Sequence, residues 1–316
     1  MSDNFDQKLT EKLAQSAFWS RVGFRVESSS EGKVRVCLPY DKGNTTAATA
    51  LHGGAIAATL DAAGCLAAWS SETRPGVSGR TLSCDVSYIA GALGNDIYGE
   101  AEVLRRGKEI IYSAVRAVDG EGKLLASGNH IYNLADPEEI PAMPPGDQQK
   151  QAWVLGRTGP GLGSFSNIDH DLAERSAARV AKSDGFIPYM NHINWKFVKA
   201  EFGYAEFLLP YKDHSVGDDG GLASGALLSG VDHAGSLAAW MTSELGRRDL
   251  FGSTVNTKLQ TFASNINRDV IVRARAAGGS GPLVNSEVSI ETVEGELVAG
   301  GSTIYRIIKR DPKPKK

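Results

Sequence analysis

The chain contains one long pattern twice, and this duplication limits the folds open to it more than any other feature. Residues 51–69 read LHGGAIAATLDAAGCLAAW, and residues 222–240 read LASGALLSGVDHAGSLAAW. The aspartates within them, Asp61 and Asp232, are 171 positions apart, since 232 minus 61 is 171. Two copies at so long a period indicate a duplicated domain. A solenoid has units of roughly 20 to 50 residues and at least three of them.

The register of the repeat is preserved beyond these two stretches. Trp69 and Trp240 are also 171 apart, whereas Thr81 and Thr254 are 173 apart, because 254 minus 81 is 173. The change predicts an insertion of two residues between the apolar stretch and the strand that follows it.

The repeat predicts two domains, residues 1–134 and 169–316. Residues 135–168 between them are rich in proline and glycine and lack a periodic pattern, which is typical of a linker. A chain of 316 residues has room for two cores of ordinary domain size.

Each half is predicted to be α+β. The apolar stretches 51–69 and 222–240 suit helices of about four turns. Apolar spacing also predicts an amphipathic helix at 6–19, with a counterpart at 172–181. We expect each long helix to pack against an antiparallel sheet of five or six strands. The strand-like segments are 24–40 (a hairpin), 81–90, 96–106, 109–119 and 123–134, then 195–211 (a hairpin), 254–263, 270–277, 283–291 and 296–308.

Each predicted helix has one acidic residue in an otherwise apolar sequence, Asp61 or Asp232. An unpaired carboxylate in such surroundings costs several kcal/mol. The aspartates are therefore catalytic candidates. The alternative is a structural role, with each carboxylate bonded to backbone donors where the two copies meet.

Composition excludes several classes of protein. A net charge of −3 argues against a nucleic-acid partner. The longest apolar runs are shorter than the roughly 20 residues of a membrane span and contain aspartate. The first residues do not resemble a secretory signal, and the three cysteines lack CxxC spacing, so we expect a cytoplasmic protein. No His, Cys or acidic cluster has the spacing of a metal site, so none is expected.

The order of motifs in the first half resembles a known family. His52-Gly53-Gly54 is followed by Asp61 on the predicted helix, and then by Thr81. This order resembles the hotdog-fold acyl-CoA thioesterases of the phenylacetate-degradation (PaaI-like) type. The resemblance implies two fused hotdog domains, each an antiparallel sheet wrapped around a long central helix. It also implies hydrolysis of an acyl-CoA to free acid and coenzyme A, without a cofactor, coenzyme A being part of the substrate.

Thioester hydrolysis requires donors for the developing oxyanion, and a carboxylate that attacks the carbonyl carbon or activates water. The helix start at Gly53 and Gly54 offers backbone N–H groups. Along a helix, however, Gly53 and Asp61 are about 12 Å apart, whereas both groups must lie roughly 3 Å from the reacting centre. The sequence therefore predicts that each site combines a glycine turn from one copy with an aspartate from the other. The resembling enzymes similarly build each site across a dimer interface.

Two unequal sites follow from this pairing. In the second, Ser224-Gly225 stands where Gly53-Gly54 stands in the first. We expect the first to be the more active, because it keeps the better oxyanion donor. The first comprises Gly53, Gly54, Asp232 and Thr254, and the second comprises Ser224, Gly225, Asp61 and Thr81.

Further residues are candidates for binding the substrate through the turn or through the coenzyme A phosphates. Arg106 and Lys108 could instead form a solvated turn, and the two threonines could be ordinary strand residues. The substrate-binding candidates are His52, Asn44, Arg106, Lys108, Ser224 and Gly225.

Two other functions stay open at this point. One is an acyl-CoA-binding protein without turnover, suggested by the altered turn at Ser224. The other is a hotdog hydratase or dehydratase, which the sequence disfavours because His233 points about 100° away from Asp232 around the helix. The fused unit is expected to associate further into a homo-oligomer.

Overall fold

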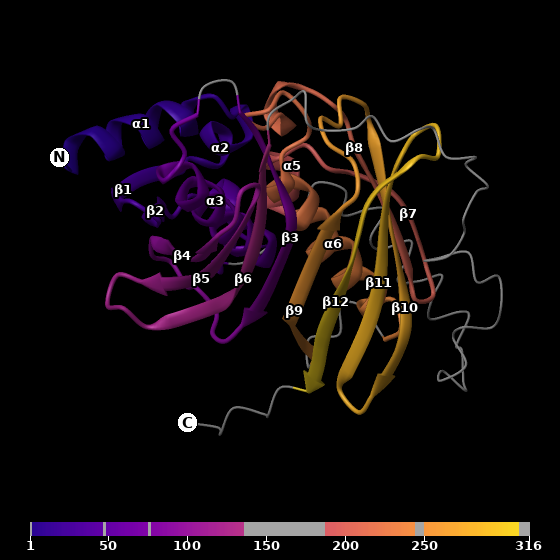
Figure 1. The fold of residues 1–316 in the computed structure, drawn as a ribbon. Helices are drawn as coiled ribbons and strands as arrows, with labels where there is room; N and C mark the ends of the chain where they lie inside the picture. Colours follow the sequence, from indigo (N-terminus) through magenta and orange to yellow (C-terminus); the bar gives the residue numbers. More distant parts are fainter. Residues whose placement is uncertain (1, 47–48, 75–76, 136–186, 244–249, 310–316) are drawn as a thin grey trace.

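One antiparallel sheet of twelve strands runs through both halves of the molecule. The computed structural model describes residues 2–46, 49–74, 77–135, 187–243 and 250–309 (Figure 1). The strand order is β1-β2-β4-β5-β6-β3-β9-β12-β11-β10-β8-β7, so each half contributes six neighbouring strands. Apart from Ala135, the predicted linker 135–168 lies outside the described residues, as does the helix predicted at 172–181.

The first half confirms the predicted order of hairpin, helix and strands. Its elements are α1 (Ser2–Ala14), α2 (Ala17–Val22), β1 (Arg25–Ser30), β2 (Lys33–Leu38), α3 (Gly53–Ser70), β3 (Ser78–Tyr88), β4 (Ile97–Arg106), β5 (Ile110–Asp119) and β6 (Leu124–Ala135).

The second half has the same order and confirms the α+β prediction. Its elements are α5 (Pro188–His192), β7 (Lys196–Glu201), β8 (Tyr204–Leu209), α6 (Ser224–Trp240), β9 (Leu250–Thr261), β10 (Val270–Ser280), β11 (Leu283–Thr292) and β12 (Leu297–Lys309).

The single helix predicted at 6–19 is wrong, because the chain forms two helices there. Ser16 interrupts them: its backbone is extended, and its hydroxyl accepts a hydrogen bond from the Trp19 amide at 3.1 Å, which caps α2. Serine side chains compete with the helical backbone for such bonds and therefore favour caps. Helix α2 ends at Gly23, whose φ of 91° suits glycine.

The duplication extends to matched hydrogen bonds. The Trp69 indole donates to the Tyr132 hydroxyl at 3.0 Å, and the Trp240 indole donates to the Tyr305 hydroxyl at 2.9 Å. The repeated residues therefore hold each long helix to the last strand of its half in the same way.

The two halves join along β3 and β9, which pair in antiparallel fashion from Ser83↔Gln260 to Ser87↔Asn256. Figure 1 shows the indigo-to-magenta half beside the orange-to-yellow half, with α3 and α6 next to each other. The helices approach closely at Gly54, where an added Cβ would lie 3.0 Å from the Ser229 Cα atom. The Ser229 hydroxyl also donates to the Gly54 carbonyl at 3.1 Å. This packing brings the start of α3 to the middle of α6.

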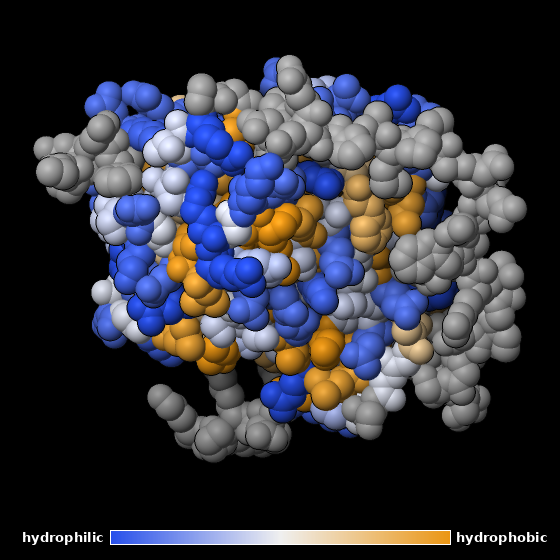
Figure 2. Space-filling view, viewed as in Figure 1, coloured by the Kyte–Doolittle hydropathy of each residue, from blue (hydrophilic) through white to orange (hydrophobic). Residues whose placement is uncertain are grey.

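The sheet encloses both long helices, so their aspartates lie in the interior. Asp61 is 0% exposed and Asp232 is 2% exposed. On the outer surface, Figure 2 shows hydrophobic patches broken up by hydrophilic residues. No helix in the described part of the chain has the length and hydrophobicity needed to cross a membrane.

Candidate functional site

The start of α3 meets Asp232 of α6, and we call this group the first cluster: His52, Gly53, Gly54, Asp232 and Thr254. Gly53 is so close to the aspartate that an added Cβ would lie 2.8 Å from Asp232 Oδ2. The glycine turn of one half and the carboxylate of the other therefore face each other, as the helix geometry required.

In the described part of the chain, the hydroxyl groups that contact Asp232 both approach the same carboxylate oxygen, Oδ1. Thr254 Oγ1 donates to Oδ1 at 2.8 Å, and Thr257 Oγ1 approaches the same oxygen at 3.3 Å. Burial raises the pKa of Asp232 to about 6, although these hydroxyls and the Gly54 amide act to lower it. The carboxylate is therefore mostly ionised at neutral pH and basic enough to accept a proton.

The Gly53 amide is an available backbone donor at the start of α3. It is the first residue of α3, and no hydrogen bond involves its N–H among the described residues. Helix N-termini leave such donors unsatisfied and carry partial positive charge. The Tyr88 hydroxyl donates to the Gly53 carbonyl at 3.0 Å and so holds the next peptide unit, between Gly53 and Gly54.

His52 caps α3. The Gly54 amide donates to His52 Nδ1 at 2.9 Å, so this nitrogen carries no proton. Burial lowers the pKa of His52 to about 4, and the ring is neutral at pH 7. The contact of 3.6 Å between His52 Nδ1 and Asp232 Oδ2 is therefore not an ion pair at that pH.

His233 extends the first cluster in a way that the sequence did not indicate. Its Nδ1 lies 3.3 Å from His52 Nε2, and the tautomer of His52 makes Nε2 the donor. Burial, then the neighbouring His52, lower the pKa of His233 well below its usual value. His233 thus supports the capping histidine from the opposite half.

The pseudo-symmetric group around Asp61 is different, and we call it the second cluster: Asp61, Cys65, Thr81, His130 and Ser224. The Ser224 hydroxyl donates to Asp61 Oδ2 at 2.6 Å. Thr81 Oγ1 lies 2.8 Å from Asp61 Oδ1, and His130 Nε2 lies 3.2 Å from that oxygen. Both oxygens of Asp61 are therefore engaged, and the Ser224 side chain fills the space that Gly53 leaves open in the first cluster.

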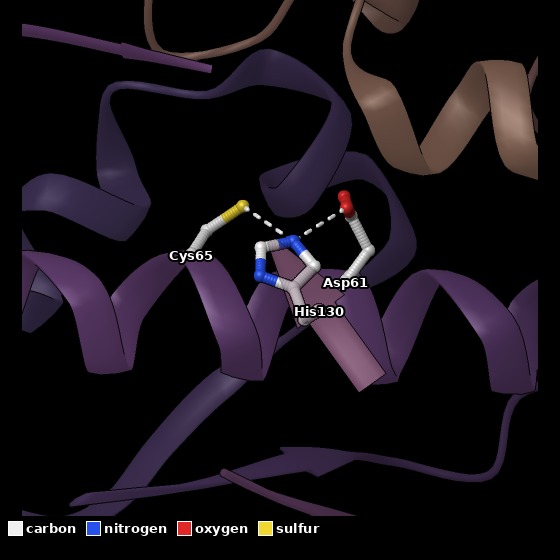
Figure 3. Close-up of side chains that lie close together, drawn as sticks. All are labelled: Asp61, Cys65 and His130. Carbon is white, nitrogen blue, oxygen red and sulfur yellow. Dashed lines mark hydrogen bonds and ion pairs between the residues drawn. The ribbon is translucent and has the colours of Figure 1, made fainter. Parts of the chain in front are cut away.

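Figure 3 shows Asp61, Cys65 and His130 converging, with Asp61 and Cys65 on α3 and His130 on β6. Their ligand atoms all lie within 4.8 Å of one another, in a group that could hold a metal ion. The sequence showed no metal-type spacing because this group forms only in the folded chain, and the expectation of no metal stays a prediction. The signal was a spacing of four residues between Asp61 and Cys65, which places both on one helix face, but the contribution of His130 depends on strand pairing.

A surface pocket reaches the second cluster. Cys65, Thr81 and Ser224 form part of its lining, together with Arg80 and Asp219. The corresponding loop beside the first cluster includes residues 47–48, which lie outside the described part of the chain.

Asn44 and Gly225, both substrate-binding candidates, have structural contacts. Asn44 is 0% exposed, and its amide donates to the Val22 carbonyl at 2.9 Å. Its own carbonyl accepts from the His52 amide at 2.9 Å, so Asn44 positions the capping histidine. Gly225 is buried, and an added Cβ would lie 2.8 Å from the Phe18 ring.

Arg106 lies far from the start of α3. Arg106 donates to Ser71 Oγ at 2.7 Å and pairs with Glu72 Oε2 at 2.7 Å, beyond the C-terminal end of α3. Eighteen residues of α3 separate this end from its start, a distance of about 27 Å. Lys108 follows in the loop between β4 and β5.

Comparisons with known proteins decide the family. The pattern of the thioesterase superfamily matches residues 49–126. Acyl-coenzyme A thioesterase 13 of Homo sapiens is 32% identical over 111 residues, which cover 34% of this chain and 78% of that protein. This chain belongs to the thioesterase superfamily.

Solved structures of similar architecture cover nearly the whole chain of this superfamily member. An acyl-CoA thioesterase II, TesB2, from Mycobacterium marinum has a TM-score of 0.55 at 15% identity, covering 96% of this chain and 99% of its own. A hot dog fold protein from Alicyclobacillus acidocaldarius has a TM-score of 0.52 at 15% identity, covering 94% and 98%. The prediction of two fused hotdog domains is confirmed.

Proposed function

We propose that this protein hydrolyses the thioester of an acyl-CoA at the first cluster. Membership of the thioesterase superfamily and the similarity to acyl-coenzyme A thioesterase 13 support the reaction class. The placement of the reaction rests on the chemistry of the residues between α3 and α6.

The contact between Gly53 and Asp232 carries this proposal. An added Cβ at Gly53 would lie 2.8 Å from Asp232 Oδ2, so only glycine lets the start of α3 lie this close to the carboxylate. An oxyanion donor and a base are thereby placed next to each other, one from each half.

In the proposed reaction, the Gly53 amide stabilises the negative charge that develops on the carbonyl oxygen. Asp232 either attacks the carbonyl carbon or removes a proton from an attacking water molecule, and Thr254 holds the carboxylate in place. The carbon–sulfur bond then breaks, and coenzyme A leaves as its thiol. When water attacks, the thiol takes up the proton that Asp232 removed. When Asp232 attacks, the thiolate takes a proton from solvent, and water then hydrolyses the acyl-aspartate anhydride to the free acid and restores the carboxylate. We propose that no organic cofactor takes part, because the chain itself supplies the base and the oxyanion donor.

The second cluster fits this reaction less well. Ser224 occupies the place of the oxyanion turn and donates to Asp61 at 2.6 Å. A substrate would have to displace this hydrogen bond before it could reach the carboxylate. We therefore propose that the first cluster carries most of the hydrolysis.

Thiol release from a panel of acyl-CoAs, followed with a thiol reagent, tests both parts of the proposal. Asp232→Asn is expected to lower kcat/KM by about 100-fold or more, because it removes the base. Asp61→Asn is the matched control and is expected to retain most of the activity. Equal losses in both variants, or a larger loss in Asp61→Asn, would contradict the choice of cluster. Tight binding without thiol release from any acyl-CoA would instead indicate a non-hydrolytic acyl-CoA-binding protein.

We infer further properties that agree with this function. The three cysteines are all buried and unpaired, which favours a reducing compartment such as the cytoplasm. The domain division at 1–134 and 169–316, the PaaI-like type and the association of the fused unit into a homo-oligomer stay predictions.

A further inference from the structure

The second cluster brings together four side-chain atoms that can each bind a metal ion. Asp61 Oδ1 and His130 Nε2 are 3.2 Å apart, His130 Nε2 and Cys65 Sγ are 3.8 Å apart, and Thr81 Oγ1 lies 3.4 Å from the sulfur. Thr81 Oγ1 also lies 2.8 Å from Asp61 Oδ1 and 3.1 Å from His130 Nε2. Two ligands of a tetrahedral zinc ion with bonds of about 2.1 Å are about 3.4 Å apart. Five of the six separations among these atoms therefore lie around this value, from 2.8 to 3.8 Å. The sixth, between the Asp61 carboxylate and Cys65 Sγ, is within 4.8 Å.

We propose that Asp61, Cys65 and His130 bind one zinc ion, with the Thr81 hydroxyl facing the fourth coordination position. Carboxylate, thiolate and imidazole together suit zinc, whereas magnesium and calcium prefer oxygen ligands alone. On binding, the Cys65 thiol loses its proton to solvent, so the site holds Zn²⁺, one thiolate, one carboxylate and a neutral imidazole. The total charge is zero, which suits residues that are at most 2% exposed.

A Cys-His-Asp proton relay does not fit the same atoms. In such a relay the carboxylate and the nucleophile face different nitrogens of the imidazole. Here both Asp61 and Cys65 face His130 Nε2, as Figure 3 shows. His130 Nδ1 is buried and has no hydrogen-bond partner among the described residues. One imidazole nitrogen cannot relay a proton between two groups, whereas an ion placed among the three ligand atoms would contact all of them.

The surrounding residues allow the imidazole and the carboxylate to take these positions. An added Cβ at Gly64 would lie 2.4 Å from the His130 ring, so glycine lets the imidazole pack directly on α3. The Ser224 hydroxyl donates to the second oxygen of Asp61 and orients the carboxylate, so that Oδ1 faces Thr81 and His130. Such secondary contacts orient metal ligands in proteins. An ion bound at Oδ1 would replace the hydrogen bond from Thr81. The pocket lined by Cys65, Thr81 and Ser224 provides a route for the ion.

The other half does not repeat the ligand set. At the repeat offsets, Ser236 takes the place of Cys65, because 65 plus 171 is 236, and Thr303 takes the place of His130, because 130 plus 173 is 303. Thr303 Oγ1 donates to the Val231 carbonyl and not to Asp232. The ligands therefore gather in the cluster whose turn carries Ser224 in place of glycine, and the zinc site is independent of the proposed hydrolysis.

Cobalt substitution tests this proposal directly. Protein freed of metal with a chelator is titrated with Co²⁺, and we expect one ion per chain with a thiolate-to-cobalt charge-transfer band and the strong visible bands of a tetrahedral site. Zinc is expected to displace the cobalt, to appear as one ion per chain in native mass spectrometry, and to raise the melting temperature. Absence of both the charge-transfer band and the retained zinc would overturn the proposal.

Variants that copy the other half identify the ligands. Cys65→Ser should abolish the charge-transfer band, and His130→Thr should weaken zinc binding by about 100-fold or more. Cys37→Ser is the matched thiol control and should bind zinc as the natural chain does. Unchanged zinc affinity in Cys65→Ser would contradict the assignment. If that variant does not fold, the double variant Cys37→Ser/Cys84→Ser leaves Cys65 as the only thiol, and loss of the cobalt band there would equally exclude Cys65 as a ligand.

Discussion

Asp232 combines nearly complete burial with a place opposite a helix start, and the two features act on its carboxylate in opposite directions. Burial is the larger effect and raises its pKa to about 6, while hydrogen bonds from Thr254, Thr257 and the Gly54 amide at the helix start act to lower it. The group must be ionised to act as a base or a nucleophile. Activity should therefore be lost as the pH falls through the pKa in the folded protein.

We accordingly expect the pH profile of kcat/KM to have an acidic limb with an apparent pKa of about 6, below which kcat/KM falls about tenfold per pH unit. Thr254→Val removes a hydrogen bond to the carboxylate and should move this limb to higher pH. The measurement is the pH profile of thiol release with a saturating thiol reagent. A limb near pH 4 would contradict the assignment, because it would match the pKa of about 4 that burial gives His52.

Gly53 and Ser224 differ by one side chain at equivalent positions, which permits an exchange experiment. Gly53→Ser places a hydroxymethyl group against Asp232 Oδ2, where an added Cβ already lies at 2.8 Å. We expect a fall of about 100-fold in kcat/KM, because the new side chain would push the Asp232 carboxylate away from the Gly53 amide.

The reverse change provides the control for this exchange. Ser224→Gly removes the donor to Asp61 and should leave hydrolysis at the first cluster within about twofold of its original rate. A large loss of activity in Ser224→Gly, together with a mild effect of Gly53→Ser, would assign the reaction to the second cluster.

At the residue scale, the sequence predicted the pairing of Gly53 with Asp232 because helix geometry forbade the pairing within one copy. It did not predict His130, since this residue enters the second cluster through strand pairing across β3 and β6. It also missed the contact between His52 and His233. A neighbour 100° around a helix cannot reach the same substrate atom, yet it can reach a residue of the other half.

At the scale of elements, the periodicity of apolar residues predicted the strands and both long helices within a few positions. The prediction of one helix at 6–19 was wrong because the apolar spacing continues across Ser16, whereas the helical backbone conformation is interrupted there. Over a single turn, the hydrogen bond of a capping hydroxyl decides where a helix begins more strongly than the spacing of apolar residues does. Helix α2 matters for the fold because Phe18 packs against Gly225 at the start of α6.

Ser16→Ala tests the importance of this break. The substitution removes the cap on the Trp19 amide and a contact of 3.3 Å to the Val216 carbonyl in the other half. We expect a loss of about 1 kcal/mol in the free energy of unfolding, measured by urea denaturation. Ser20→Ala, at an exposed position of α2, is the control and should change stability by less than about 0.5 kcal/mol. Equal effects would show that the cap contributes nothing specific.

At the scale of the whole molecule, the continuous sheet and the packing of α3 on α6 join the halves into one body. Separating them would expose both buried aspartates and break the β3–β9 ladder. The duplication predicted that the halves associate, because each site needed residues from both. The β3–β9 pairing itself could not be predicted, since strand order depends on contacts between distant segments.

We therefore expect one unfolding transition for the whole chain. The calorimetric enthalpy should equal the van't Hoff enthalpy, and near- and far-ultraviolet circular dichroism should change together on heating. Two resolved transitions would mean that the halves fold independently and that the β3–β9 pairing adds little coupling.

The covalent joining of the copies has a genetic consequence. When two identical subunits share an interface, every codon change appears on both sides of the symmetry axis, so neither site can be altered alone. In this protein Ser224, Cys65 and His130 each exist once, and their counterparts are Gly53, Ser236 and Thr303. Joining the copies in one chain thus allows the residues of one cluster to change while those of the other stay the same.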